Sequence, residues 1–568
     1  MTPLRQATSA PLALLLLAAC ATGGTVATPP VGTPPISPAA GPPPAEVSAE
    51  RLAEHIQVLA SDEFLGRGPA TRGEELTVAY VAEQFRLAGL EPGGPDGTWY
   101  QEVPLVMADI VGTPTLAFAT PAGRRALTQG EEIAVRATMH EVDRVELRDA
   151  PVVFLGYGVR APERDWDDYR GQDLRGKVGI VLVNDPDFET GEGDFGGKAM
   201  TYYGRWTYKY EEAARQGLAG MLVVHETEPA SYGWGVVANS NTNTMFDIVR
   251  ADPAAVHPLV EGWIQRDLAV ELLRAAGHDF EALKRRAQTR EFTPVALDGV
   301  AFTAAHGVRR SRIASRNVLG RLRGSARPDE TILYGAHWDH LGIGAPDARG
   351  DSIFNGAVDN ATGTAAVMEL ARVFAAGPRP ERSVVFAAWT VEEKGLLGSE
   401  YYADNPVYPL ETTVAGFNID AMEPHGPARD LLVVGAGQSE LEDHLARHLA
   451  AAGRVATPDP NPEAGYFFRS DHFPMAKRGV PMLYVDSGED LVEGGRAAGE
   501  ANAAAYRRDR YHQQADEYDP AWNLEGIAQD VALLHRMGLE LASSRAWPNY
   551  LPSSEFRPIR DASAARRR

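Results

Sequence analysis

Residues that bind metal ions in other proteins stand directly after short apolar runs of this sequence. The runs TILYGA, SVVFAAWT and VAGFNI are typical of short buried strands, and further such residues lie in GAVDNATG and RYHQQADEYD. The residues concerned are His337, Asp359, Glu392, Glu393, Asp420 and His512. Histidine nitrogens with carboxylate oxygens form a donor set that suits zinc. Because ligands of an open α/β sheet gather beyond the carboxyl ends of its strands, we expect these side chains to lie together.

Each of these residues, taken alone, also has an ordinary structural explanation. Asp359 precedes a helical pattern and is of the type that caps a helix N-terminus. Glu392-Glu393 is typical of a solvated charged loop, and Asp420 of a turn. Their joint position at strand ends favours metal-assisted hydrolysis, in which one carboxylate binds the ion and a neighbour takes a proton from water.

Asp339 stands two residues after His337, where it could hold that ring in place. A histidine that binds metal usually donates its other ring N–H to a carboxylate, so we expect Asp339 to orient His337. A structural hydrogen-bonded pair is the alternative. Three other histidines compete with His512 for the last ligand position, namely His444, His448 and His472.

The segment around these residues alternates buried strands with amphipathic helices. From residue 315, strand patterns alternate with helices predicted over 363–374 and 525–542, which favours an α/β fold with a mixed, mostly parallel sheet flanked by helices. Helices are also predicted from Ser48 and over 74–87, and short strands from about residue 110. We predict a catalytic domain over 47–109 and 301–545, an inserted domain over 110–300, and a disordered tail over 546–568.

Composition limits the class of protein. The chain has 568 residues, 44% of them hydrophobic and 23% charged, as in a soluble protein of two or three domains. Its net charge of −22 disfavours a nucleic-acid partner, because phosphate contacts need clustered Lys and Arg.

The N-terminus predicts an exported, lipid-anchored protein. Residues 1–20 combine a positive charge with a short apolar stretch and end on Leu-Ala-Ala-Cys, which resembles the lipobox of bacterial lipoproteins. Cys20, the single cysteine, would carry the lipid, and the Pro/Gly-rich residues 21–46 would form a tether. An ordinary cleaved signal peptide is the alternative. We expect a location in the bacterial cell envelope, at the outer membrane if Cys20 is acylated.

The motifs GAHWDHLG, NGAVDNATGTA, VEEKGLLGSEYY, FNIDAM, RSDHFP and RYHQQADEYD, read in this order, resemble the co-catalytic zinc aminopeptidase superfamily. The resemblance covers 315–542, and residues 150–240 resemble its inserted α+β protease-associated domain. It implies two Zn²⁺ ions per chain. His337 and Asp420 would hold one ion and Glu393 and His512 the other, with Asp359 bridging them. Glu392 would be the general base.

The resemblance also suggests residues around the metal site. Tyr511 matches a tyrosine that supports the tetrahedral intermediate, although some relatives place it where this chain has Tyr466 and Phe467. His472 and Asp516 are expected behind the ligands or in the pocket. Tyr203 and Arg205 of the inserted domain are candidates for the pocket wall, with membership of the core as their alternative. The Gly/Ala-rich residues 488–510 are expected to form a mobile lid.

These observations predict a zinc metallopeptidase outside the cytoplasm, acting on peptide substrates as an aminopeptidase. A carboxypeptidase or dipeptidase remains open, because the pocket charges that select the substrate terminus are not placed by sequence. A glutaminyl cyclase, which shares the fold with one zinc ion, and a non-enzymatic cell-surface binding protein are the other hypotheses. The oligomeric state is open, with a homodimer as one option.

Overall fold

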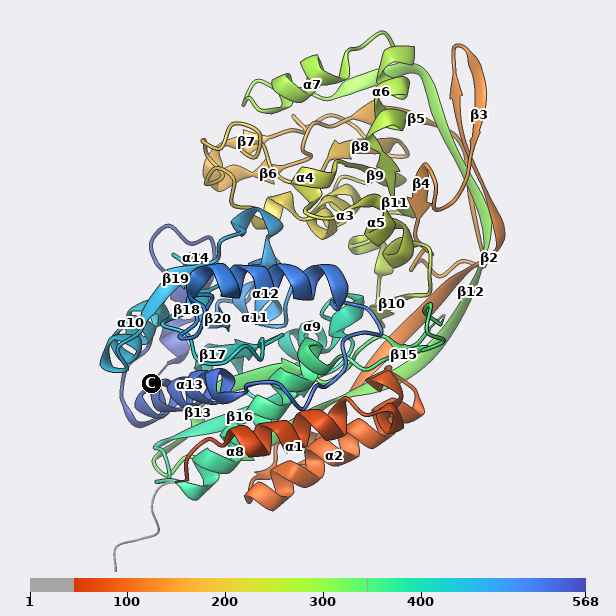
Figure 1. Cartoon of the computed structure of the whole chain (residues 1–568). Coiled ribbons are helices and arrows are strands. Elements are labelled where there is room, and N and C mark those ends of the chain that lie inside the picture. The colour runs from red at the N-terminus through yellow and green to blue at the C-terminus, as the bar shows by residue number, and fades with distance from the viewer. Residues whose placement is uncertain (1–44, 345, 568) are drawn as a thin grey trace, which may run out of the picture. The chain divides into compact units, whose positions relative to one another are not determined.

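The computed structural model describes residues 45–344 and 346–567 (Figure 1). Cys20 and nearly all of the predicted tether lie outside the described residues, so the lipid anchor stays a prediction. Within the described part of the chain, no helix has the length and apolar character needed to span a membrane.

Four parallel strands form the centre of the main sheet. They are β13 (Arg327–His337), β16 (Arg382–Trp389), β17 (Thr413–Ile419) and β20 (Met482–Asp486). β13 pairs in parallel with both β16 and β17, and β17 pairs in parallel with β20. Because the three neighbours β16, β13 and β17 run in one direction, their carboxyl ends meet at one edge of the sheet.

Antiparallel strands flank this parallel centre. β12 (Val295–Leu322) pairs antiparallel with β16, and β18 (Asp430–Val433) pairs antiparallel with β20. Beyond it, β19 (Val455–Pro458) pairs in parallel with β18. The expected mixed, mostly parallel sheet flanked by helices is therefore confirmed.

Helices cover both faces of the central strands. One hydrophobic core joins one face of the sheet to α1 (Ala49–Leu59), α2 (Arg72–Ala88), α8 (Gly363–Ala376) and α13 (Glu525–Ser543), the layer along the bottom of Figure 1. A second core joins the other face to α9 (Leu397–Asp404) and α11 (His472–Ala476). Along β13, Tyr334 enters the first core and Leu333 the second, as the two-residue period of a strand requires.

The structure contains the short strands expected after residue 110 and, in addition, two long strands that the sequence does not predict. β2 (Tyr100–Thr120) and β12 pair antiparallel from Tyr100–Val318 to Ala119–Ala301. The expected boundaries at 110 and 301 therefore fall inside continuous strands, because strand pairing continues where hydrophobic patterning changes. The boundaries themselves stay predictions.

The residues between these long strands form a second parallel group. β5 (Arg144–Phe154), β8 (Val178–Leu182), β9 (Gly220–His225) and β11 (Val260–Gln265) are parallel neighbours, and β5 pairs antiparallel with β12. Helix α3 (Trp206–Arg215) connects β8 to β9, and helix α6 (Arg266–Ala275) follows β11. The core of this region is separate from the cores of the main sheet.

Two segments differ from the sequence prediction. Residues 488–510 contain helix α12 (Gly495–Asp509) rather than a lid loop, because Ala503 and Tyr506 are buried on one side of it. The tail after residue 545 contains helix α14 (Arg557–Ala562) rather than a disordered chain. Its fully buried Arg560 donates hydrogen bonds to the carbonyl oxygens of Thr413 and Val414 at the start of β17, both at 3.0 Å.

Candidate metal centre

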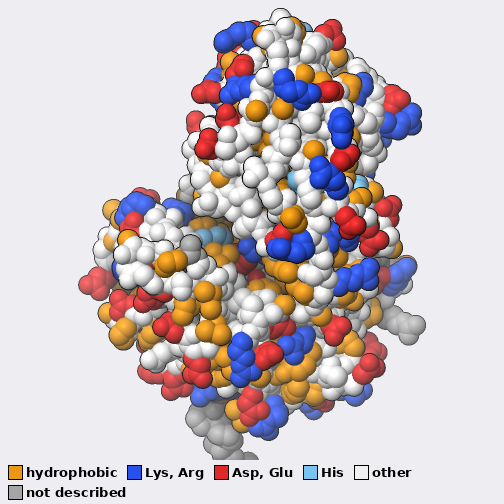
Figure 2. Space-filling view, turned by 90° about the vertical axis from the view of Figure 1, so that its right-hand side faces the viewer, with side chains coloured by type: hydrophobic (Ala, Val, Ile, Leu, Met, Phe, Trp, Pro, Cys, Tyr) orange, Lys and Arg blue, Asp and Glu red, His pale blue; other side chains and the backbone are white. Residues whose placement is uncertain are grey.

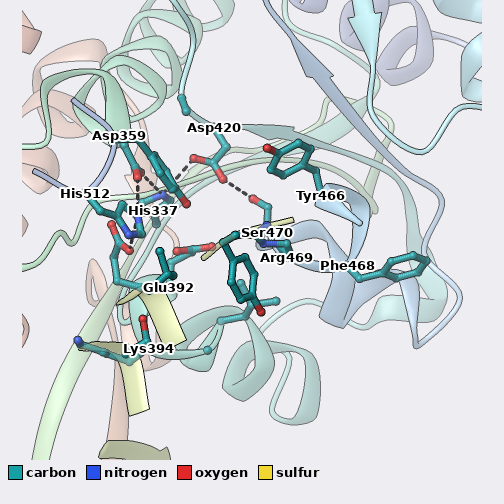
Figure 3. Close-up of a pocket in the computed structure, with 18 of the residues that line it drawn as sticks. His337, Asp359, Glu392, Lys394, Asp420, Tyr466, Phe468, Arg469, Ser470 and His512 are labelled. Atoms are coloured by element: carbon teal, nitrogen blue, oxygen red, sulfur yellow. Dashed lines mark hydrogen bonds and ion pairs between the residues drawn. The ribbon is translucent and has the colours of Figure 1, made fainter. Parts of the chain in front are cut away.

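The carboxyl ends of three parallel strands bring the predicted ligands together (Figure 3). His337 is the last residue of β13, Asp420 follows β17 directly, and Glu392 lies three residues after β16. The parallel register of β13 with β16 and β17 thus turns residues that are far apart in sequence into neighbours. This is the arrangement that the strand-end reasoning predicts.

The turn that presents the two glutamates has strained backbone. Val391 has a φ of +55°, a left-handed conformation that a β-branched residue rarely adopts. Its carbonyl oxygen accepts a hydrogen bond from the Leu397 N–H, which holds the turn against the start of α9. Such strain persists where surrounding contacts enforce it, and it is concentrated at functional sites.

The loop before α8 presents Asp359 between two histidines. Asp359 Oδ1 lies 3.2 Å from His337 Nε2, and Asp359 Oδ2 lies 3.1 Å from His512 Nε2. The side chain of Asp516 accepts hydrogen bonds from the backbone N–H groups of Val358 and Asp359, each at 3.1 Å. Asp516 therefore fixes the Asp359 loop from behind, and each oxygen of Asp359 faces a different histidine.

Two further carboxylates complete a group around each histidine. Asp420 Oδ1 lies 3.1 Å from His337 Nε2, and Glu393 Oε2 lies 3.1 Å from His512 Nε2. Ligand atoms of His337, Asp359 and Glu393 also lie within 4.8 Å of one another, as do those of His337, Glu392 and Asp420. The result is two three-residue groups that share Asp359, with the carboxylate of Glu392 alongside.

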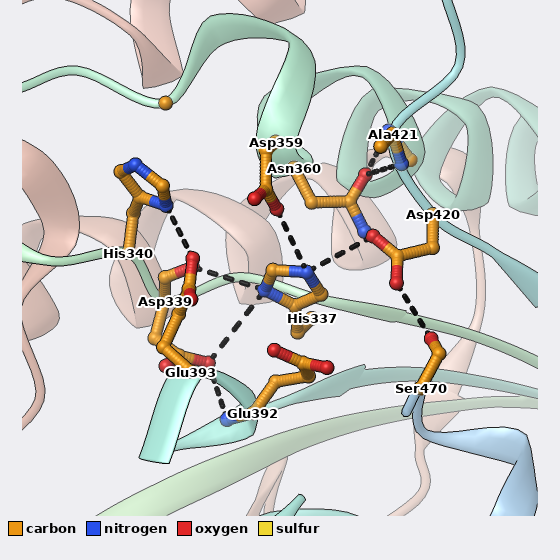
Figure 4. A network of polar contacts seen from close by, with 12 residues as sticks. His337, Asp339, His340, Asp359, Asn360, Glu392, Glu393, Asp420, Ala421 and Ser470 are labelled. Atoms are coloured by element: carbon orange, nitrogen blue, oxygen red, sulfur yellow. Dashed lines mark hydrogen bonds and ion pairs between the residues drawn. The ribbon is translucent and has the colours of Figure 1, made fainter. Parts of the chain in front are cut away.

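His337 is oriented differently from the prediction (Figure 4). Its Nδ1–H donates to the backbone carbonyl oxygen of Asp339 at 3.1 Å, whereas the Asp339 carboxylate lies 3.9 Å from Nδ1. The Asp339 Oδ1 instead accepts a hydrogen bond from the Glu392 N–H at 3.1 Å. Asp339 therefore orients His337, as expected, but through its backbone carbonyl rather than its carboxylate. The Nε2 atom of His337 is left facing Asp359 and Asp420.

Opposite charges in this cluster shift one another's protonation. Burial alone would lower the pKa of His337, but Asp420 and the other carboxylates raise it well above its usual range. In the same way, Glu393 and the carboxylate hydrogen bonds outweigh burial and raise the pKa of His512 to about 10. The carboxylates thus draw cations into this space, where divalent ions would displace protons from the histidines.

Glu392 differs from the other carboxylates in its electrostatic environment. Burial and the nearby charges of Asp420 and Glu393 raise the pKa of Glu392 well above its usual range. By contrast, the charges of His512 and His340 outweigh burial and lower the pKa of Glu393. Glu392 and Glu393, although adjacent, therefore have different electrostatic environments, which fits different roles for the two residues.

The donor set fits zinc. It offers one histidine nitrogen and one carboxylate in each group, with a two-oxygen carboxylate between the groups. Zinc is bound in proteins by such nitrogen and oxygen donors. Buried Asp339 also keeps one carboxylate oxygen without a hydrogen-bond partner.

Three residues that support the site were not identified from sequence. His340 Nδ1 lies 2.5 Å from Glu393 Oε1, and Ser470 Oγ donates to Asp420 Oδ2 at 2.6 Å. Both belong to motifs that were recognised, GAHWDHLG and RSDHFP, but only their geometry shows which ligand each one touches.

The third is Arg67, whose fully buried guanidinium donates to the carbonyl oxygens of Leu59, Trp338, Asn355 and Gly356. It ties the chain after His337 to the chain before Asp359. No local sequence signal marks it, because its partners are backbone atoms from distant segments.

The remaining candidates divide between the pocket and the core. Tyr511 lines the pocket and stacks on His512, with ring centroids 3.9 Å apart. Arg205 also lines the pocket, whereas Tyr203 lies outside it and donates its hydroxyl hydrogen to Glu163 at 2.7 Å. Tyr466, the alternative to Tyr511, lines the pocket as well.

His472 does not approach the cluster. It is fully buried between the rings of Phe467 and Tyr484, and burial lowers the pKa of His472 to about 3. A side chain held in an aromatic core stays neutral and packs there, so the ligand position falls to His512. His444 and His448 both contact Glu540 instead.

A large cavity opens onto the cluster. Its volume is about 1800 Å³, and its walls include residues of the main sheet, such as Glu392 and Tyr484, and residues between the long strands, such as Arg205 and Trp263. Figure 2 shows that the surface is hollowed and that charges of both signs are interspersed around it. The site is therefore reachable by a ligand the size of a peptide.

Comparisons with known proteins agree with the motifs. Residues 317–534 match peptidase family M28. The chain is 39% identical over 112 residues to aminopeptidase NAALADL1 of Mus musculus, covering 19% of this chain and 13% of that protein. It is 30% identical over 194 residues to leupeptin-inactivating enzyme 1 of Streptomyces exfoliatus, covering 33% of this chain and 40% of that one. The chain thus spans less than half the length of these relatives.

Among solved structures, an aminopeptidase from Aneurinibacillus sp. strain AM-1 has 18% identity and a TM-score of 0.49, covering 88% of this chain and 95% of that chain. A zinc aminopeptidase from Bacillus subtilis has 17% identity and a TM-score of 0.44, covering 90% of this chain and 97% of that chain. The expected resemblance to the zinc aminopeptidases is confirmed by the family match.

Proposed function

We propose that this chain, whose residues 317–534 match peptidase family M28, is a zinc metallopeptidase that removes residues from the N-termini of peptides. The observation that carries the proposal is the position of Asp359, which turns one carboxylate oxygen to His337 and the other to His512. That geometry supports two metal ions. Release of the N-terminal residue, rather than the C-terminal one, follows the names of the relatives.

His337 and Asp420 would hold one ion and Glu393 and His512 the other, with Asp359 shared. Bound zinc polarises the scissile carbonyl and lowers the pKa of water. The backbone carbonyl of Asp339 keeps His337 Nε2 free for binding, because it takes the hydrogen of Nδ1.

Glu392 and Tyr511 supply the proton transfers and the hydrogen bond of the reaction. Glu392 accepts a proton from the attacking water and delivers it to the leaving amine, a role that its position beside His337 and Asp420 supports. Burial raises the pKa of Tyr511 well above its usual range, so its hydroxyl keeps its hydrogen. It therefore serves as a donor to the oxygen of the tetrahedral intermediate.

Digestion of a matched peptide set tests the proposal. The set combines free and acetylated N-termini with free and amidated C-termini, and the protein is assayed zinc-loaded and after chelation. We expect release of the N-terminal residue only where the N-terminus is free, and no release after chelation. Equal cleavage of acetylated peptides, or release from the C-terminus alone, would contradict the aminopeptidase assignment. Conversion of N-terminal Gln to pyroglutamate with one bound zinc would support the cyclase instead.

The location of the protein is a separate proposal. It rests on the sequence around Cys20, which is expected to carry a lipid that holds the enzyme in the bacterial cell envelope. Replacement of Cys20 by Ala should move the protein from the membrane fraction to the soluble fraction. Retention of the variant in the membrane fraction would refute the anchor.

A further inference from the structure

Two arginines of the cavity have no anionic partner. Arg205 precedes α3, and Arg469 precedes Ser470, whose hydroxyl bonds the metal-ligand candidate Asp420. Within the described residues, neither guanidinium makes a hydrogen bond or an ion pair to a carboxylate. Arg205 is only 8% exposed, and its Nε is buried without a partner. An unpaired buried charge is costly, which favours an anionic ligand at this place.

Two other arginines of the same cavity are paired. Arg136 lies 3.3 Å from Glu261, and Arg250 lies 2.8 Å from Asp247. In each pair a carboxylate of the protein already neutralises the guanidinium, so these two arginines are less available to an anionic ligand. Among the buried and half-buried arginines of the cavity wall that the structure describes, Arg205 and Arg469 are thus the two without a carboxylate partner.

Aromatic rings lie against both guanidinium groups. Arg469 lies over the rings of Tyr466 and Tyr232, at 5.3 Å and 5.9 Å from the centroids, and Arg205 lies 5.8 Å from that of Trp206. Burial and the like charge of Arg469 lower the pKa of Arg205 to about 10, which leaves it charged at neutral pH. Two positive charges on the wall of one cavity attract an anion to it.

The position of Arg469 places this charge next to the reaction site. Figure 3 shows Arg469 beside Ser470 and near Glu392. The charge of Glu392 acts on Arg469, as does the hydroxyl of Tyr511. An anion bound here would lie within the same cavity as the peptide bond to be cut.

We propose that Arg205 and Arg469 bind a carboxylate group of the peptide substrate next to the metal centre. Arginine is the side chain best matched to a carboxylate, because its N–H groups form two parallel hydrogen bonds. The carboxylate is either the C-terminus of a very short peptide or an acidic side chain near the scissile bond. The inference rests on the proposed peptidase function and adds a substrate class to it.

Matched substrates distinguish the two sources of the carboxylate. One pair compares Leu-Gly with Leu-Gly amide, and two others compare Asp with Asn on either side of the scissile bond in amidated peptides. For the wild-type enzyme, we expect kcat/KM to favour the charged member by about tenfold or more in at least one pair, as charged hydrogen bonds predict. A preference in the first pair identifies the C-terminal carboxylate, and a preference in the others an acidic side chain.

Variants then assign the preference to the two arginines. Arg205→Gln and Arg469→Gln should bring the charged-to-neutral ratio close to one. Arg508→Gln is the matched control, because Arg508 also lines the cavity but is exposed and paired with Asp509. If Arg205→Gln does not fold, Arg469→Gln still tests the site, because Arg469 is only half-buried. Arg205→Lys is a second variant at Arg205, which keeps the positive charge but cannot form two parallel hydrogen bonds.

The outcomes separate this inference from the proposed function. Hydrolysis of all pairs with ratios near one in the wild type leaves the peptidase intact and overturns the carboxylate site. A wild-type preference that survives both Gln variants also overturns it. Failure of the zinc-loaded enzyme on every charged and neutral peptide overturns the proposed function, and with it the inference.

Discussion

Ser470 offers a way to weaken one metal site more than the other. Its Oγ donates a hydrogen bond to Asp420 Oδ2 at 2.6 Å and accepts one from the Asn418 side-chain amide at 2.7 Å. Asp420 presents its other oxygen to His337. Ser470→Ala removes the contact that fixes this carboxylate and leaves the opposite site untouched, because His340 supports Glu393 there.

The expected loss follows from the strength of such a contact. Residues behind a metal ligand contribute about 10- to 100-fold to metal affinity, or about 1.4–2.7 kcal/mol. A hydrogen bond to a charged group is worth about 1.5–3 kcal/mol, which agrees. We expect zinc affinity to fall by this factor at the His337 site and by less at the His512 site, which feels the change only through Asp359.

Stepwise zinc titration against a chromophoric chelator measures the two affinities. His340→Gln is the matched variant for the other site, since it removes the partner of Glu393. The weakened step should differ between the two variants. If both variants weaken both steps equally, or if Ser470→Ala binds both ions as the wild type does, the assignment of Ser470 to one site is refuted.

Three further predictions concern stability. Arg67→Met leaves several buried carbonyl oxygens without donors, and each loss costs about 1–3 kcal/mol. Thermal scans should therefore show a large fall in Tm. An unchanged Tm would contradict the role of Arg67 in connecting the chain after His337 to the chain before Asp359. Burial alone would lower the pKa of His257, but the carboxylates of Glu261 and Asp247 raise it to about 9. The charged His257 therefore stabilises the fold below pH 6.5, and this stabilisation is lost between about pH 6.5 and 9. The contribution is on the order of 3 kcal/mol, and Tm measured across this range should fall more for the wild type than for His257→Gln; parallel curves would refute it. Gly538→Ala should destabilise the protein, because the added methyl group meets the Tyr334 hydroxyl inside the core. Denaturant unfolding measures the difference from Gly235→Ala, an exposed helical control whose added methyl group meets nothing; equal stability of the two variants would contradict the clash.

The sequence predicts the metal centre better than its surroundings, for a physical reason. His337 and Asp420 follow strands whose apolar runs are visible in the chain, and parallel strands must bring their carboxyl ends together. The pairing within the cluster is less visible. That Asp339 orients His337 through its carbonyl, and that His340 touches Glu393, depends on turn geometry that composition does not encode.

The errors in the fold come from segments stabilised by distant contacts. Residues 495–509 are rich in Gly and Ala and have the composition of a loop, yet burial of Tyr506 stabilises a helix there. The C-terminal residues look polar, but Arg560 of α14 donates hydrogen bonds to two backbone carbonyls of β17 and so fixes this segment to the sheet. His472 stands in a recognised motif, and only the aromatic rings around it show that it belongs to the core.

In the proposed mechanism, Glu392 transfers the proton and the five other residues bind metal. Glu392→Gln tests this most directly, through zinc content and turnover measured on the same preparation. We predict two zinc ions per chain, as in the wild type, with kcat reduced by about 10²- to 10⁴-fold, the usual contribution of a general base. Loss of one ion from the variant would show that Glu392 is a ligand. Near-wild-type turnover with both ions bound would show that another group takes the proton.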